Sequence, residues 1–133
     1  MKQHKDILIR QSFEKADEAL LSAKINIDNN MLTTAQNRIY YAIFYSVLAL
    51  GYYRNFVTSK HGQLLGWFNK TFIYEENVFS HEFFEIYKEA FESRRKSDYE
   101  FSWKPNREDI LSDLESAKNF VQKIKEYVSN LDI

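Results

Sequence analysis

The stretch Ile39-Tyr40-Tyr41-Ala42-Ile43-Phe44-Tyr45-Ser46-Val47-Leu48-Ala49-Leu50 decides the fold, because it is apolar or aromatic on almost every side. At the period of an α-helix, these residues leave no continuous polar face for solvent. We predict that they belong to a helix over about 35–53. A helix of this kind is buried on more than one side, so it must lie at the centre of a helical bundle, at a subunit interface, or in both.

Three further long helices and one shorter helix surround this segment in the predicted fold. Apolar residues recur at intervals of three and four over about 7–27, and again without a break over about 110–131. A shorter helix is expected over about 60–71 and an aromatic one over about 80–98. The fold prediction is therefore an all-α, mainly antiparallel bundle of four long helices plus one shorter helix, forming a single domain over 1–133.

Short polar side chains and glycines give further local predictions. Ser80 and Asn106 are suited to cap the helices that follow them, and Thr33 or Thr34 to cap the long apolar helix. Two glycines lie four apart in the shorter helix, at 62 and 66, where each costs about 1 kcal/mol relative to alanine. We predict that this pair allows a close helix–helix contact.

The composition excludes several classes of protein. The 133 residues include no cysteine, so disulfides and thiolate metal sites are impossible. No group of His, Asp and Glu residues has the spacing of metal ligands, and we predict neither a metal nor a cofactor. With a net charge of −1, the chain needs a local patch to bind nucleic acid. It has no apolar run of membrane-spanning length and no apolar signal segment, which predicts a cytoplasmic protein with no membrane contact.

Three short motifs follow one another along the chain. Asn37-Arg38-Ile39-Tyr40-Tyr41-Ala42-Ile43-Phe44 lies on the second helix, Lys60-His61-Gly62 opens the shorter helix, and Arg94-Arg95-Lys96-Ser97-Asp98-Tyr99 ends the aromatic helix. The first resembles the N-R-x-Y-Y-A-x-F signature of HEPN-domain proteins, and the third resembles the R-x-K-A-D-Y of their small single-domain bacterial and archaeal branch. With an acidic last helix, the resemblance covers about residues 10–128.

The resemblance implies an all-α bundle that is commonly a homodimer, with its polar motif residues near the dimer interface. It also implies an RNA-binding protein or a metal-independent endoribonuclease, or the partner of a small nucleotidyltransferase in a toxin–antitoxin or defence system. We therefore expect a second copy of the chain, RNA and a nucleotidyltransferase as the partners to test.

Catalytic branches of the family carry an arginine followed, a few residues later, by a histidine. Arg94 matches the arginine, but Tyr99 stands where the histidine is expected. Tyrosine, with an ordinary pKa near 10, is a poor base at neutral pH, although it can donate a hydrogen bond to phosphate or stack on a base. The candidate catalytic residues are Arg94, which would steady the phosphate, Tyr99 and His61, which would move protons, and Asp98.

The remaining candidates come from the same motifs. The predicted dimer interface contains Tyr41 and Tyr45, the second of which stands at another position where the family has histidine. The candidate nucleic-acid contacts are Asn37, Arg38, Lys60, Arg95 and Lys96.

A plainer interpretation of the same residues stays open. Cations in a last helical turn interact favourably with the helix dipole, and Arg94 and Asp98 are spaced as an i,i+4 pair. A lone histidine at a helix start is commonly a cap or a surface residue. The alternative hypothesis is a catalytically inert domain used for dimerisation or for docking a partner.

Overall fold

The structure is a computed structural model that describes residues 2–100 and 104–131. Its α-helices are α1 (Lys2–Asp28), α2 (Leu32–Tyr53), α3 (His61–Phe68), α4 (His81–Tyr99) and α5 (Arg107–Leu131). A π-helix, η1 (Asn69–Glu75), continues α3 directly. The described residues contain no strand, which confirms the predicted all-α class. Within the same residues, no helix is both long and apolar enough to cross a membrane.

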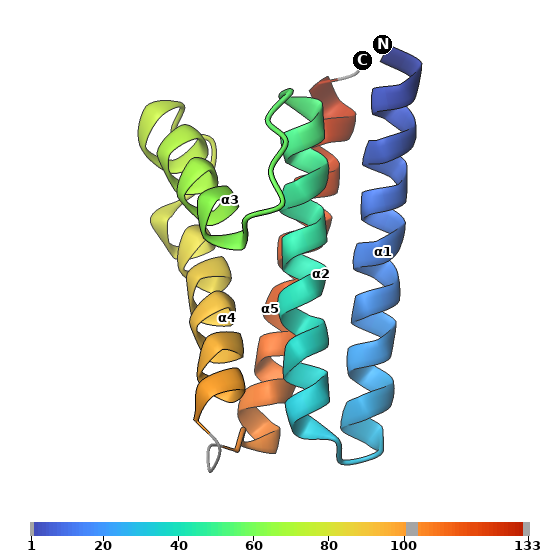
Figure 1. The fold of residues 1–133 in the computed structure, drawn as a ribbon, viewed down its shortest axis with the longest axis vertical. Helices are drawn as coiled ribbons and strands as arrows, with labels where there is room; N and C mark the ends of the chain where they lie inside the picture. The colour runs from blue at the N-terminus through green and yellow to red at the C-terminus, as the bar shows by residue number, and fades with distance from the viewer. Residues whose placement is uncertain (1, 101–103, 132–133) are drawn as a thin grey trace.

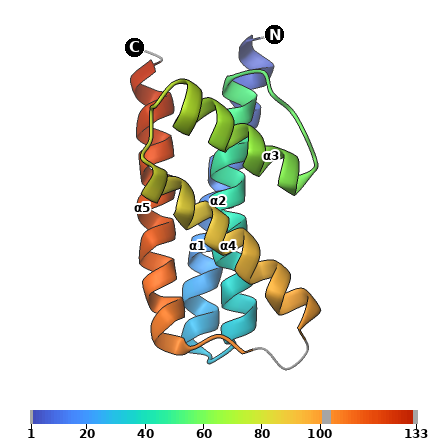
Figure 2. The ribbon, with the colours of Figure 1, turned by 90° about the vertical axis from the view of Figure 1, so that its left-hand side faces the viewer.

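The four long helices run alternately down and up the bundle, so that α1 begins and α5 ends at the same end (Figure 1). Helix α2 packs against α1, α3, α4 and α5. Tyr40, Val47, Ala49 and Leu50 on this helix are all completely buried. Of the two positions predicted for this helix, the centre of the bundle is confirmed, and the subunit interface stays a prediction. Helices α3 and α4 cross α2 obliquely (Figure 2). Each brings one candidate residue against α2: His61 comes from α3 and Arg94 from α4.

Two of the predicted helix caps are confirmed and one is wrong. The backbone N–H of Phe83 donates to Ser80 Oγ (3.1 Å). Asn106 Oδ1 likewise accepts from two backbone N–H groups at the start of α5 (2.8 and 3.2 Å). Thr33 and Thr34 do not cap α2, because Asn30 turns the chain with a φ of 58° and the helix already begins at Leu32. Both threonines therefore lie inside the first turn.

The predicted role of Gly62 and Gly66 is also wrong. Both are exposed, and a Cβ added at either would meet nothing within 4 Å. Packing instead requires Gly51, which is buried near the end of α2. A Cβ at this position would lie 2.6 Å from the carbonyl oxygen of Phe56, where the loop turns back over the helix.

Helix α3 does not end near residue 71 as predicted, because η1 carries it on to Glu75. Its wider turns let the neighbouring Phe72 and Ile73 both reach the core. Arg54 holds this segment against the bundle. Its guanidinium lies 4.8 Å above the Phe72 ring, pairs with Glu76 and donates to Tyr127 Oη (3.0 Å).

An aromatic core joins α3, η1, α4 and α5. Phe68 lies at its centre, completely buried, with six aromatic rings around it. The centroid distances range from 5.7 to 6.5 Å, and the rings belong to Phe72, Phe79, Phe83, Phe84, Tyr87 and Phe120. This core sets the positions of α3 and α4, and therefore of the residues at their ends.

Candidate functional site

Three helices bring His61 and Arg94 to the same pair of tyrosines on α2. His61 is the first residue of α3, and its Nδ1 lies 2.7 Å from Tyr40 Oη. Arg94, in the last turns of α4, places its guanidinium 4.8 Å from the centroid of the Tyr40 ring and donates from Nη1 to Tyr41 Oη (3.4 Å). We call His61, Arg94, Tyr40 and Tyr41 the His61–Arg94 cluster.

The ring of His61 is fixed by stacking as well as by its hydrogen bond. It lies on Phe44, one turn after Tyr40 on α2, with ring centroids 4.1 Å apart and planes 12° from parallel. Tyr41 meets the same imidazole edge-on at 5.7 Å. Because Tyr40 is fully buried and Phe44 nearly so, α2 provides a rigid aromatic platform for the imidazole.

The protonation states of the cluster follow from its burial and charge. Partial burial lowers the pKa of His61, and the positive charge of Arg94 lowers it further. Burial raises the pKa of Tyr40, and this effect outweighs the opposing effect of Arg94. At neutral pH the Tyr40 phenol is therefore protonated and the imidazole is neutral. Both tautomers of His61 can form the 2.7 Å hydrogen bond: Tyr40 Oη donates to Nδ1 in one, and Nδ1–H donates to Tyr40 Oη in the other. An imidazole that accepts at Nδ1 carries its own proton on Nε2, so it presents an N–H donor there.

We expect Arg94→Gln to raise the pKa of His61. In the folded protein this pKa lies below its ordinary value of 6.5, so the unfolded chain binds the proton more readily. The free energy of unfolding should therefore fall as the pH drops below about 6.5, and it should fall less in Arg94→Gln. An NMR titration of the His61 ring in both proteins measures the effect. Arg95→Gln is the control, and equal His61 pKa values in all three proteins would contradict the assignment.

A polar cavity lies between the start of α2 and the end of α4. Its volume is about 230 Å³. Each side chain around it carries a hydrogen-bond donor, and the lining residues are Thr33, Thr34, Asn37, Arg94 and Ser97. Asn37 Oδ1 accepts from Arg38 at Nε and Nη2 (3.1 and 2.8 Å), which leaves the amide N–H groups of Asn37 as its remaining donors. We call this the Arg94 cavity.

The structure brings some of the other candidate residues to this region. Asn37 lines the Arg94 cavity, and Arg38 lies over the Tyr41 ring at 5.0 Å. Tyr41 belongs to the cluster and is half-buried, as is Tyr45. Lys60 is exposed immediately before His61.

The cations after Arg94 lie elsewhere. Arg95 and Lys96 are exposed and line a separate open groove, together with Tyr99 and three glutamates. Tyr99 is 80% exposed, and no hydrogen bond or ring contact of the described residues joins it to His61. The side chain of Asp98 lies outside the described residues.

Sequence reasoning missed several residues of this region. Tyr40 and Phe44 belong to the first motif but are not among the candidate site residues predicted from the sequence, although the hydroxyl of one and the ring of the other hold His61. Thr33 and Thr34 were treated as caps, and Ser97 carried no prediction. A sequence signal existed, since Thr33, Thr34 and Asn37 fall on one side of a helix, as do Arg94 and Ser97. The pattern could not show that these two sides face each other.

Comparison with known proteins supports the resemblance found in the motifs. A family model described as the HEPN domain matches residues 9–127. A "UPF0332 protein" of Thermotoga maritima is 32% identical over 96% of this chain and 96% of its own length. Two proteins of Methanocaldococcus jannaschii, "Putative toxin MJ0142" and "Putative toxin MJ0605", are 30% and 32% identical over 94% and 92% of this chain, and over 84% and 90% of their own lengths. The chain belongs to the HEPN domain family.

Proposed function

We propose that this HEPN protein is a toxin component that binds RNA, with a phosphate group held between the Arg94 cavity and His61. The observation that carries the proposal is the convergence of Arg94 and His61, 33 positions apart in the sequence, on the ring of Tyr40. The names of its two archaeal relatives favour a toxin.

The donors around the cavity suit an anion. A guanidinium forms charge-assisted hydrogen bonds with phosphate, and hydroxyl and amide groups complete its coordination. Thr33 and Thr34 also place the cavity at the N-terminus of α2, which is the positive end of the helix dipole. Arg38 adds a second cation beside Tyr41. A local patch of this kind can bind RNA although the chain carries a net charge of only −1.

The arrangement also indicates which part of RNA cleavage these residues could perform. Arg94 would stabilise the charge that develops on a pentavalent phosphate. A neutral His61 with its proton on Nε2 would donate a hydrogen bond to a phosphate oxygen, whereas protonating the leaving oxygen would require the imidazolium form. Accepting the proton of a 2′-hydroxyl would require the other tautomer, whose Nδ1 carries the proton. The 2.7 Å contact with Tyr40 allows both tautomers, so the support for binding and charge stabilisation comes from Arg94 and from the donors around its cavity.

An RNA-binding measurement with two matched variants tests the proposal. Arg94→Gln and Arg95→Gln each remove one positive charge from neighbouring positions, but only Arg94 lines the cavity. We expect Arg94→Gln to weaken binding of a fluorescent single-stranded RNA about tenfold or more, as the loss of one charge-assisted hydrogen bond predicts. We expect Arg95→Gln to change binding by less than about threefold, the scale of an exposed charge.

Equal losses in the two variants would show that RNA is held by diffuse charge and would contradict the proposed site. The same proteins at stoichiometric concentration, incubated with RNA in EDTA across the pH range, test cleavage separately. Cleavage that Arg94→Gln abolishes would extend the proposal to an endoribonuclease. Intact RNA with Arg94-dependent binding would restrict it to a binding role.

The proposal includes a homodimer and a nucleotidyltransferase partner, because the family resemblance implies both. The half-buried Tyr41 and Tyr45 are the proposed dimer contacts. Their rings lie 5.8 Å apart on α2, and Lys15 lies over Tyr45 at 5.7 Å. The molar mass in solution tests the dimer directly. A monomer at high protein concentration would contradict the interface.

One observation favours the alternative, an inert domain that docks a partner. Leu21 and Ile25 are one turn apart on α1 and are 63% and 51% exposed. Neighbouring apolar side chains of this size mark a surface at which another molecule is commonly bound. RNA binding that Arg94→Gln leaves unchanged, together with loss of partner binding in Leu21→Ser, would favour this alternative.

A further inference from the structure

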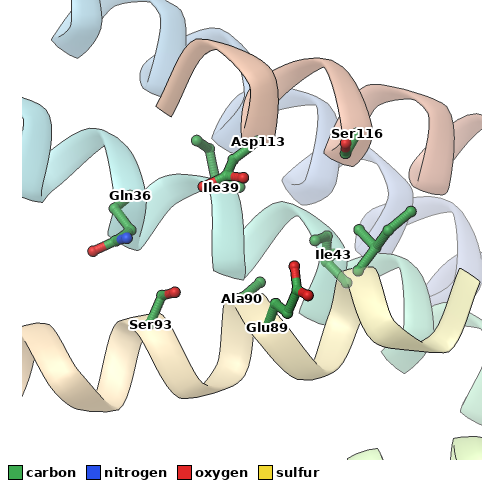
Figure 3. A pocket seen from close by; sticks show the side chains of 9 residues that line it. Gln36, Ile39, Ile43, Glu89, Ala90, Ser93, Asp113 and Ser116 are labelled. Carbon is green, nitrogen blue, oxygen red and sulfur yellow. The ribbon is translucent and has the colours of Figure 1, made fainter. Parts of the chain in front are cut away.

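The hydroxyl of Tyr40 lies inside the protein with one hydrogen-bond partner among the described residues. Tyr40 has no exposed surface, and its Oη lies 2.7 Å from Nδ1 of His61. The side chain lines neither the Arg94 cavity nor the pocket between α2, α4 and α5 (Figure 3). Neither solvent nor these two cavities therefore provides another acceptor for the phenol proton.

The direction of this hydrogen bond follows from the burial of the phenol. If Nδ1–H donated to Tyr40 Oη, the phenol proton would need a different acceptor, and none is found among the described residues. A buried donor without an acceptor loses its hydration and gains nothing in return, so this arrangement is disfavoured. If Tyr40 donates to Nδ1 instead, both groups are satisfied and the imidazole proton remains on Nε2.

The same hydrogen bond sets the orientation of the His61 ring. The imidazole stacks on Phe44 with the two planes 12° from parallel. A ring rotated by half a turn about its Cβ–Cγ bond would lie in the same plane, so stacking does not distinguish the two orientations. The hydrogen bond of Nδ1 does distinguish them. Tyr40 is itself held in place by its complete burial and by the guanidinium of Arg94, 4.8 Å from its ring centroid.

We propose that Tyr40 is the positioning residue of His61: its buried hydroxyl donates to Nδ1 and keeps the imidazole proton on Nε2, which then donates to a phosphate oxygen of RNA. The His61 side chain is half-buried, and its Nε2 has no hydrogen-bond partner among the described residues. In this form Nε2 cannot accept the proton of a 2′-hydroxyl. The inference deepens the proposed function and rests on it for the contact with phosphate.

NMR of the full chain, labelled with ¹⁵N in its histidines and measured at about pH 8 without RNA, shows which imidazole nitrogen is protonated. His61→Gln identifies the signals of His61. The pKa of this residue lies below its ordinary value of 6.5, so the ring is neutral under these conditions. In the unchanged protein we expect the Nε2–H form to exceed the Nδ1–H form at least about tenfold, the effect of one unpaired buried group.

Tyr40→Phe removes the hydroxyl and keeps the ring on which Arg94 lies. We expect it to raise the ratio of the Nδ1–H form to the Nε2–H form about tenfold, and to weaken binding of the fluorescent single-stranded RNA about threefold to tenfold. Tyr87→Phe is the matched control, because it removes another completely buried hydroxyl, one that has no hydrogen-bond partner among the described residues. We expect it to change neither the ratio nor RNA binding.

A predominant Nδ1–H form in the unchanged protein would overturn the proposal. So would a ratio that Tyr40→Phe leaves unchanged, or that Tyr87→Phe changes equally. Weaker RNA binding in Arg94→Gln but not in Tyr40→Phe would show that the Nε2 donor does not contact RNA, which also overturns it. If the ratio depends on Tyr40 while RNA binding does not depend on Arg94, the role of Tyr40 toward His61 is supported and the proposed function fails.

Discussion

Replacing Phe68 by alanine is expected to lower the free energy of unfolding by about 3–5 kcal/mol, the range for a fully buried phenylalanine. The side chain has no exposed surface, and its ring lies among six other aromatic rings from η1, α4, α5 and the loop between η1 and α4. The cavity left by the ring would be surrounded by rigid aromatic groups that fill it poorly. Since domains of this size are stable by only about 5–15 kcal/mol, the variant would lose a large part of its stability.

Urea denaturation followed by circular dichroism measures this loss. Tyr74→Ala is the matched control, because Tyr74 is an aromatic residue of the adjoining η1 that is 70% exposed. We expect this control to change the free energy of unfolding by less than about 0.5 kcal/mol. Similar losses in the two variants would contradict the buried position of Phe68.

We expect the second large effect from replacing Gly51 by alanine, which should lower the free energy of unfolding by about 3 kcal/mol. The added Cβ would lie 2.6 Å from the backbone carbonyl oxygen of Phe56. A backbone carbonyl cannot rotate away as a side chain can, so the cost should lie at the upper end of the range for overpacking. The change would also disturb the turn in which Phe56 N–H donates to Gly51 O (2.8 Å).

Gly66→Ala should have the opposite effect. Its added Cβ meets nothing within 4 Å, so only the higher helix propensity of alanine acts, and it should raise stability by up to about 1 kcal/mol. Thermal and urea unfolding of both variants would measure the contrast. If Gly66→Ala were less stable than the unchanged protein, this result would contradict the open position of Gly66 and would support the close helix–helix contact that the sequence predicts there.

The three glycines of the chain illustrate how much a sequence pattern conveys about packing. The spacing of Gly62 and Gly66 predicted a close contact, yet both residues are exposed. Gly51 carried no comparable signal, because its partner is a loop carbonyl five residues later in an irregular turn. Helical periodicity reports which side of a helix is apolar, but it does not report where a loop backbone passes.

The candidate site shows the same difference between what the sequence pattern predicts and what the packing decides. Arg94, Arg95 and Lys96 are consecutive, and the sequence treated them as one basic patch. Successive side chains on a helix point about 100° apart, since a turn contains 3.6 residues. Arg94 therefore faces the tyrosines of α2, while Arg95 and Lys96 line a different groove.

The sequence by itself determined the all-α fold, the burial of α2 on more than one side and the membership of the family. Those properties depend on local periodicity and on motif order, which the chain carries directly. Only the tertiary structure decided that Tyr40 holds His61 and that Thr33, Asn37 and Ser97 share a cavity with Arg94. These contacts join helices that are distant in sequence, and the aromatic packing around Phe68 sets how α3 and α4 cross α2.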